Sequence, residues 1–340
     1  MKAGYLVEPR RIDVREVEVP RPSPGGVVVR VRVALTDGTD LKAYRRGHPQ
    51  MPMPTRFGHE FSGDVAAVGA GVTSFAAGDR IACVHSAPDG TCYWCAHGEE
   101  ELCESVMRTK ILGAYAEYID VPAHIVARNA YALAPDTSYE TAAFLEPLAC
   151  VVHAQRELDA RRGAALAIIG DGGFGMLHAL VARATGFQPV LVGRRASRLQ
   201  FARDLGIRQT IDARESDAAA QVRALTGGRG ADAAIECTGA REVWEAAPAF
   251  VRRGGMVVLF GGLPADTRVA FEAGRLHYDE ITLRSPFHFT PRDVRGAFEL
   301  LVQRAVDVVP LIGARFALTE LAAAFELLDR GDVLKIAVAA

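Results

Sequence analysis

Residues 166–175 read LAIIGDGGFG, an apolar run that passes directly into a glycine-rich turn and then into a predicted helix, Phe174–Thr185. A G-x-G-x-x-G turn between a buried strand and a helix is typical of dinucleotide-binding units, because its glycines let the backbone turn tightly and approach a pyrophosphate. The N–H groups at the helix N-terminus then face the phosphates. A plain structural turn is the alternative. The candidate cofactor contacts in this turn are Gly170, Gly172, Gly173, Phe174 and Gly175.

The region around this turn alternates between predicted strands and helices. Helical stretches such as Phe174–Thr185 and Ser197–Leu205 separate short apolar runs. This alternation predicts a parallel sheet with helices on both faces, a doubly wound α/β unit of the Rossmann type. The apolar runs are Ala165–Ile169, Pro189–Val192, Gln209–Ile211, Ala233–Ile235, Met256–Phe260 and Ile281–Leu283.

The end of the second predicted strand bears on which dinucleotide would bind. A carboxylate at this point would accept a hydrogen bond from the ribose 2′-hydroxyl of NAD. The sequence instead has Gly193, which leaves room for a 2′-phosphate, followed by Arg194 and Arg195, whose guanidinium groups can pair with it. We therefore expect NADP, with NAD as the less favoured cofactor, although arginines at a solvated helix start are also ordinary.

The chain on either side of this region has a different pattern. Val27–Val33 largely alternates valine and arginine, which predicts a half-buried strand, and Gly58–Gly78 is punctuated by glycines, as in a compact β-rich domain. The tail contains two predicted helices and a last strand, and we expect it to return to the first domain. The expected domains are therefore residues 1–146 with 286–340, and residues 147–285. The tail elements are Pro291–Arg304, Leu318–Arg330 and Leu334–Val338.

The composition excludes several classes of function. With 340 residues, 49% of them hydrophobic and 24% charged, the chain is long enough for two globular domains of roughly 100–200 residues each. A formal net charge of −2 provides no basic field for nucleic acid or anionic lipid. The N-terminus has no signal-peptide core, and no run reaches the roughly 18 apolar residues of a membrane span. We therefore expect a cytoplasmic protein with neither nucleic-acid nor membrane partners.

Three cysteines and an aspartate follow one another at metal-ligand spacing. Asp89, Cys92, Cys95 and Cys103 are separated by two, two and seven residues. Four donors close together in sequence can surround one tetrahedral zinc ion, and a carboxylate oxygen can replace a thiolate. The spacing predicts a structural zinc site, with three reduced thiols and no metal as the alternative.

A second polar group comes from Asp37-Gly38-Thr39-Asp40, Gly58-His59-Glu60 and Glu146-Pro147-Leu148. Each segment alone is ordinary, since a His-Glu pair is usually a satisfied structural pair. Together they resemble the zinc-containing medium-chain dehydrogenase/reductase family, which includes polyol, glucose and threonine dehydrogenases, over essentially the whole chain. The further motifs that carry the resemblance are MKAGYLVEP at residues 1–9, GHEFSG at 58–63, GDR at 78–80, EPLAC at 146–150, ECTG at 236–239, RGG at 253–255, FGG at 260–262 and LK at 334–335.

The resemblance implies a GroES-like catalytic domain, a Rossmann cofactor domain and a catalytic zinc site. His59 matches the family's histidine ligand, Glu60 the adjacent carboxylate, and Glu146 a carboxylate that binds the metal directly or through water. The family's cysteine ligand is replaced here by Asp37. Carboxylates are harder and less selective ligands than thiolates, so another divalent ion is the alternative to zinc. Thr238 and Gly261, in the matching ECTG and FGG segments, are implied as further cofactor contacts.

The implied reaction interconverts a secondary alcohol and its ketone by hydride transfer to or from the nicotinamide, with the metal polarising the oxygen. Thr39 matches the family's proton-relay hydroxyl. Lys42 occupies the next relay position, where histidine is common, and would shuttle a proton, contact the substrate or simply be exposed. Glu60 and Glu146 are candidate catalytic as well as metal-binding residues.

The substrate class and the rival functions follow from the same resemblance. The EPL and GHE context, with FHFTP at residues 287–291, is similar to branches acting on polyols, sugars and cyclitols, including deoxy-scyllo-inosamine dehydrogenases. A metal-free quinone or enoyl reductase of the same superfamily is one rival, and a non-catalytic NADP-binding protein is the other. We also expect a homodimer or homotetramer, paired through the edge strand near Ile281–Leu283.

Overall fold

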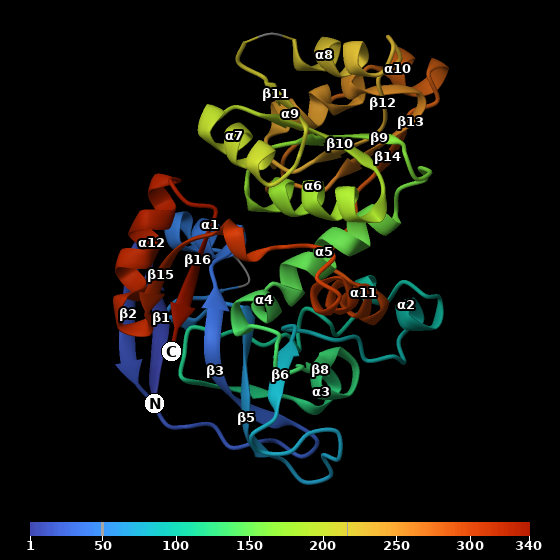
Figure 1. Cartoon of the computed structure of the whole chain (residues 1–340). Helices are drawn as coiled ribbons and strands as arrows, with labels where there is room; N and C mark the ends of the chain where they lie inside the picture. The colour runs from blue at the N-terminus through green and yellow to red at the C-terminus, as the bar shows by residue number, and fades with distance from the viewer. Residues whose placement is uncertain (49–50, 216) are drawn as a thin grey trace. The chain divides into compact units, whose positions relative to one another are not determined.

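The computed structural model describes residues 1–48, 51–215 and 217–340. These residues form two compact units (Figure 1). The first unit comprises Met1–Ala149 and Phe289–Ala340, and the second comprises Cys150–His288, with boundaries slightly later in the chain than those expected from the sequence. Within the described ranges, no helix is both long and apolar enough to span a membrane.

The second unit is built on a parallel sheet with strand order β11-β10-β9-β12-β13-β14. Helix α6 covers one side of the sheet, and α8 and α10 lie on the other (Figure 1). Because both faces are covered, every residue of Leu166–Ile169 in the central strand is at most 6% exposed. The doubly wound sheet predicted for this region is confirmed. The strands are β9 (Ala165–Ile169), β10 (Gln188–Gly193), β11 (Gln209–Asp212), β12 (Ala231–Glu236), β13 (Val251–Leu259) and β14 (Thr282–Arg284).

The helices of this unit follow the strands in alternation. Helix α6 begins directly after the glycine-rich turn, is capped by Gly172, and ends at Gly186, whose left-handed backbone closes the helix. Residues from α8 and from the segment after α9 pack on one face of the sheet to form a continuous apolar core. The helices are α6 (Gly173–Thr185), α7 (Ala196–Asp204), α8 (Ala218–Leu225), α9 (Arg241–Ala246) and α10 (Ala273–Tyr278).

The first unit is rich in β-structure, as predicted. Among its described residues, one sheet has the strand order β15-β16-β3-β5-β6-β8, with β7 paired to β3, and a smaller sheet has the order β2-β1-β4. The strands of the larger sheet are β3 (Val27–Leu35), β5 (Glu60–Val68), β6 (Arg80–Cys83), β7 (Tyr118–Val121), β8 (Ala130–Ala132), β15 (Ile312–Ala317) and β16 (Lys335–Ala339). The strands of the smaller sheet are β1 (Lys2–Glu8), β2 (Arg11–Glu16) and β4 (Thr55–Arg56).

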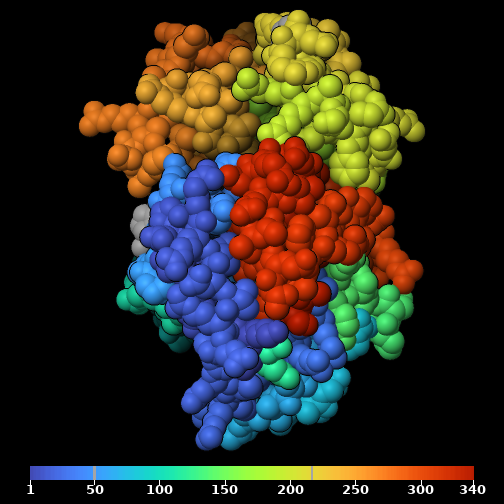
Figure 2. Space-filling model, turned by 90° about the vertical axis from the view of Figure 1, so that its left-hand side faces the viewer, coloured from blue at the N-terminus to red at the C-terminus, as the bar shows by residue number. Residues whose placement is uncertain are grey.

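The chain tail completes the first unit. Strand β16 pairs with β3, and α12 packs against α1 and β2. Figure 2 shows the C-terminal residues in red lying against the N-terminal residues in blue. The core contains residues from both ends of the chain, Leu6 and Phe325 among them. The helices are α1 (Gly38–Arg46), α2 (Tyr93–Ala96), α3 (Ala123–Asn129), α4 (Tyr139–Ala143), α5 (Leu145–Arg156, which crosses into the second unit), α11 (Pro291–Val302) and α12 (Leu321–Arg330).

Strand pairing in the larger sheet brings distant polar residues to one edge. The last residue of β3, Leu35, pairs with Glu60 at the start of β5 and with Ala337 in β16. This pairing brings three residues close together: Thr36, which follows β3; His59, which precedes β5; and Lys335, which begins β16. A buried polar cluster lies at this edge.

Candidate functional site

His59 lies at the centre of a buried polar cluster in the first unit. Its Nε2 atom is 3.6 Å from Asp37 Oδ2 and 4.0 Å from Glu146 Oε2. Among the described residues, His59, Glu60 and Glu146 each offer a ligand atom within 4.8 Å of the others. Asp37, the N-cap of α1, adjoins this group through its contact with His59. The structure thus brings together the four residues that the resemblance implied as metal ligands.

Asp40 lies at the other side of the His59 ring, and Tyr115 donates a hydrogen bond to Asp40. Asp40 Oδ1 lies 3.6 Å from His59 Nδ1, and Asp40 Oδ2 accepts a hydrogen bond from the Tyr115 hydroxyl at 2.8 Å. Asp40 and Tyr115 are both fully buried. A carboxylate facing Nδ1 favours the tautomer in which Nε2 is free to bind a metal. The sequence contained Asp40 within the Asp-Gly-Thr-Asp segment, but no sequence signal assigned it this role.

Glu60 pairs with a lysine from the far end of the chain. Lys335 Nζ donates to Glu60 Oε1 and Oε2 at 2.6 and 2.5 Å and to the Thr36 carbonyl at 2.9 Å. Glu60 is fully buried and Lys335 is 4% exposed. The sequence analysis named Lys335 only as part of a family motif and gave it no role in the site, because only the pairing of β16 with β3 places it here. Both oxygens of Glu60 are thus engaged by a cation from the protein itself.

The electrostatics of the cluster favour a positive charge at its centre. Burial alone would lower the pKa of His59, but the carboxylates of Asp40, Glu146 and Asp37 outweigh it and raise that pKa to about 10. Burial raises the pKa of Glu60 to about 8 despite Lys335, and the pKa of Glu146 to about 7 despite His59. The carboxyl groups therefore crowd one another, and a cation would relieve that repulsion.

Asp37 behaves differently from the two glutamates. Burial raises its pKa, but His59, Lys335 and hydrogen bonds from Thr39 together bring it below the ordinary value. The Thr39 backbone N–H donates to Asp37 Oδ2 at 2.7 Å. Asp37 is therefore a stable carboxylate, available both to cap α1 and to face His59.

The two candidate proton-relay residues lie on α1. Thr39 is half-buried beside Asp37, whereas Lys42 is exposed.

His85, which sequence reasoning did not single out, is buried next to the cluster. Its Nδ1 lies 3.4 Å from Glu146 Oε1, and its ring meets that of His59 edge-on at 5.0 Å.

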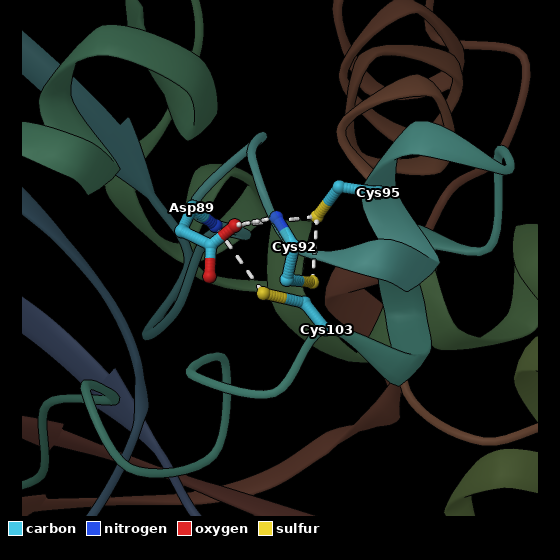
Figure 3. Close-up of side chains that lie close together, drawn as sticks. All are labelled: Asp89, Cys92, Cys95 and Cys103. Carbon is cyan, nitrogen blue, oxygen red and sulfur yellow. Dashed lines mark hydrogen bonds between the residues drawn. The ribbon is translucent and has the colours of Figure 1, made fainter.

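A second cluster is formed by Asp89, Cys92, Cys95 and Cys103, each offering a ligand atom within 4.8 Å of the others. Figure 3 shows the carboxylate and the three sulfur atoms turned toward a common centre. Cys92 caps α2, Cys95 lies within that helix, and Cys103 ends a short 3-10 turn. Short local elements therefore position the three cysteines, and Asp89 lies in the loop before α2.

Hydrogen bonds fix Asp89 in this second cluster. Its Oδ1 accepts from the backbone N–H groups of Thr91 and Cys92 at 2.7 and 3.0 Å, and its Oδ2 accepts from the Ser105 hydroxyl at 2.9 Å. These bonds lower the pKa of Asp89 below its ordinary value. Ser105 also lies 3.3 Å from Cys103 Sγ and thus links two members of the cluster.

The thiols of the second cluster differ in acidity. Hydrogen bonds from the backbone at Cys95 and Glu104 lower the pKa of Cys92. Burial and the neighbouring thiols raise the pKa of Cys95 to about 12. Three sulfurs and a carboxylate brought this close favour a bound cation, because thiolates are stabilised by a metal and repel one another without it.

The glycine-rich turn of the second unit passes from β9 into α6 with little space to spare. A Cβ atom at Gly175 would lie 1.8 Å from the carbonyl oxygen of Gly170, so helix and strand can approach this closely only with glycine at 175. Gly172, Gly173 and Phe174 form the first turn of the helix and its cap. The backbone N–H groups of this turn form the start of α6, as the motif predicts.

Strand β10 ends at Gly193 and is followed by Arg194 and Arg195, both of which are exposed. Their backbone N–H groups donate to Asp171 Oδ2 at 2.9 and 2.8 Å. No carboxylate stands at the end of β10 itself, but the carboxylate of Asp171, from the glycine-rich turn, lies against it. Sequence reasoning missed this contact.

Thr238 and Gly261 follow the neighbouring strands β12 and β13. Buried Glu236 accepts hydrogen bonds from the Thr238 backbone N–H at 2.6 Å and from the Thr238 hydroxyl. Gly261 N donates to the Glu236 carbonyl at 2.9 Å, and a Cβ at Gly261 would lie 2.3 Å from Gly239 N. All the candidate cofactor residues thus lie at the carboxyl ends of adjacent parallel strands, where such sheets bind ligands.

Comparison with known proteins adds to this geometry. Residues 23–131 match the alcohol dehydrogenase GroES-like domain, and residues 173–303 match the zinc-binding dehydrogenase domain. The chain is 30% identical to sorbitol dehydrogenase of Bacillus subtilis over 99% of its own length and 97% of that protein. It is 31% identical to L-threonine 3-dehydrogenase of Bacillus velezensis over 95% of its length and 94% of that protein.

A solved structure from Sinorhizobium meliloti 1021, with NADP bound, superposes with a TM-score of 0.92 at 28% identity, covering 100% of this chain and 99% of the other. The order of the two family matches along the chain agrees with a GroES-like first unit followed by a cofactor-binding second unit. The resemblance inferred from the sequence is therefore confirmed: the chain is an oxidoreductase of the zinc-type medium-chain alcohol dehydrogenase family.

Proposed function

We propose that the protein is a metal-dependent, NADP-preferring dehydrogenase that interconverts a secondary alcohol and its ketone. The observation that carries the proposal is the buried cluster in which His59 Nε2 faces the carboxylates of Asp37 and Glu146, with Glu60 close by. A histidine and several carboxylates that are buried together favour a bound cation over a metal-free pocket, because buried charges are normally paired.

The donor set fits a divalent ion. Asp37, His59 and Glu146 would hold it, and Glu60 would join them or remain with Lys335. We propose zinc first, with another divalent ion as the alternative because the oxygen donors discriminate weakly. The bound ion would supply a Lewis acid for the substrate C–O group, and the nicotinamide would accept or donate the hydride.

The protein's own side chains have distinct roles in this proposal. Asp40 orients His59, and Lys335 balances the charge of Glu60. Thr39, half-buried beside Asp37, is the candidate group for moving the hydroxyl proton. Exposed Lys42 would pass that proton to water or contact the substrate.

The second cluster is proposed as a structural zinc site. It supplies four donors, which is the closed coordination of structural zinc, and hydrogen bonds already place Asp89 toward the three thiols. This site would fix the loop between β6 and β7 and take no part in the chemistry.

The cofactor proposal rests on Gly193 at the end of β10 and on Arg194 and Arg195, which follow it. Two exposed guanidinium groups beside a residue without a side chain favour a 2′-phosphate. The NADP bound to the Sinorhizobium meliloti relative agrees with this preference.

The sorbitol dehydrogenase relative supports a polyol, sugar or cyclitol substrate. We also propose that the protein is a homodimer or homotetramer, joined at the edge strand β14.

The test is a substrate panel of polyols, sugars, cyclitols and simple secondary alcohols. Turnover is measured with NADP and with NAD, before and after treatment with a chelator, and the metal content is measured on the same sample. We expect NADP-dependent oxidation of at least one polyhydroxylated alcohol, and its loss when the metal is removed. Full activity in metal-free protein would overturn the proposal in favour of a metal-free reductase, and tight NADPH binding without turnover or metal would favour a binding protein.

A further inference from the structure

The carboxylate of Asp171 occupies an anion-binding position in the second unit. The backbone N–H groups of Arg194 and Arg195 both donate to its Oδ2, at 2.9 and 2.8 Å. Arg198 Nη1 donates to the Asp171 carbonyl at 3.3 Å, so a further guanidinium lies close to the same turn. Consecutive N–H groups aimed at one acceptor form a small anion-binding nest. Here the protein's own carboxylate fills that nest.

Gly193 is what lets Asp171 reach this position. A Cβ atom at 193 would lie 2.7 Å from both Cβ and Oδ2 of Asp171 and 2.8 Å from Leu199 Cδ2. Contacts this short cannot be accommodated without moving the turn. The space that the sequence suggested for a 2′-phosphate is therefore already occupied, in part, by a negative charge.

This position matters because the segment after the second strand of such a sheet receives the 2′ group of the adenosine ribose. The Arg194 and Arg195 side chains are exposed and would attract a 2′-phosphate. Asp171 would repel it, because like charges brought together at a binding site reduce affinity. A 2′-hydroxyl, by contrast, can donate a hydrogen bond to a carboxylate.

We propose that Asp171 is a specificity-determining residue that competes with the 2′-phosphate and limits the preference for NADP over NAD. The inference rests on the proposed function, since it concerns the cofactor of the same site. To bind NADP, the protein must either hold the phosphate on the arginine side chains beside Asp171 or release Asp171 from the nest. Both routes cost binding energy that NAD does not lose.

Two variants of the full-length, metal-containing protein test this. Asp171→Asn removes the charge and keeps one acceptor oxygen for the nest, and Asp171→Ala removes both. Dissociation constants for NADPH and NADH are measured by nucleotide fluorescence, and thermal melting checks that the turn is intact. We expect the ratio of the NADH constant to the NADPH constant to rise about tenfold in Asp171→Asn, chiefly through tighter NADPH binding.

The matched control is Asp204→Asn, which makes the same change of net charge at an exposed position in α7. Its ratio should stay within about twofold of the wild type, because charges separated by solvent are screened. An equal shift of the ratio in this control would overturn the inference. If the wild type binds NADPH and the ratio is unchanged in both Asp171 variants, the inference is also wrong, but the proposed function still stands. A wild type that binds neither nucleotide would overturn both.

Discussion

The two candidate metal-binding clusters of the first unit are built in different ways. The cluster around His59 is buried, rich in oxygen donors and assembled from residues as far apart in the chain as Asp37 and Lys335. The cluster around Asp89 is mostly half-buried, rich in sulfur and contained within residues 89–103. The first already holds its own cation, the Lys335 ammonium. In the second, within the part of the chain that the structure describes, Arg128 donates to the backbone carbonyl of Asp89 and no ion pair engages the Asp89 carboxylate.

This difference indicates what each cluster requires. Burial makes uncompensated carboxylates costly, so the first cluster depends on Lys335 and on a positive charge near His59. The second cluster is more exposed, so its charges cost less to bury, and we propose that a bound metal orders its crowded thiols. The difference predicts a catalytic role for the first cluster and a role in local stability for the second. Four substitutions test this prediction, in order of decreasing expected effect.

The largest effect is expected from His59→Ala. Removing the imidazole that faces both Asp37 and Glu146 should lower kcat/KM by about 10⁴-fold, through loss of metal-assisted charge stabilisation. NADPH affinity, measured by fluorescence titration, should stay nearly unchanged because the cofactor residues lie in the second unit. A variant that keeps more than about a tenth of its activity would remove His59 from the chemistry.

Lys335→Met should destabilise the fold by about 3–5 kcal/mol, because Glu60 is left buried without its partner. The free energy of unfolding is measured in urea with a chelator present, so that metal binding does not contribute. The double variant Glu60→Gln/Lys335→Met should recover most of the loss. Equal destabilisation in the single and double variants would mean that packing, and not the ion pair, makes Lys335 important.

Asp40→Asn should weaken metal binding at the first cluster by about 10–100-fold, the usual cost of losing a carboxylate behind a histidine ligand. The measurement is a competition titration with a fluorescent zinc chelator. Tyr115→Phe is the matched control, since it removes the hydroxyl that donates to Asp40 and leaves the carboxylate in place. If the control weakens binding as much as Asp40→Asn does, the carboxylate itself is not what holds His59.

The smallest effect is expected at the second cluster. Asp89→Cys supplies a fourth thiolate, a softer donor, and should slow zinc release to a chromophoric chelator by about tenfold. Asp89→Asn, which removes the charge without adding a thiolate, should speed release. Identical release from all three proteins would show that Asp89 is not a ligand.

The local motifs allowed much of this to be predicted from the sequence. The glycine-rich turn, the spacing of Cys92, Cys95 and Cys103 and the strand–helix alternation each involve neighbours in the chain, so a few residues specify them. The fold class and family were confirmed on this basis. Element boundaries were close but not equal: β13 begins at Val251, several residues before the apolar run that predicted it.

The remaining features depend on contacts between distant segments, which no short stretch of sequence encodes. Lys335 reaches Glu60 because β16 pairs with β3, and Asp40 faces His59 because α1 follows β3 at the edge where β5 begins. Asp171 meets the N–H groups of Arg194 and Arg195 because β9 and β10 are neighbours in the sheet. The sequence by itself determined which groups could bind a metal and a dinucleotide. The tertiary structure decided which charges stand beside them, because only strand pairing brings residues far apart in the chain into contact.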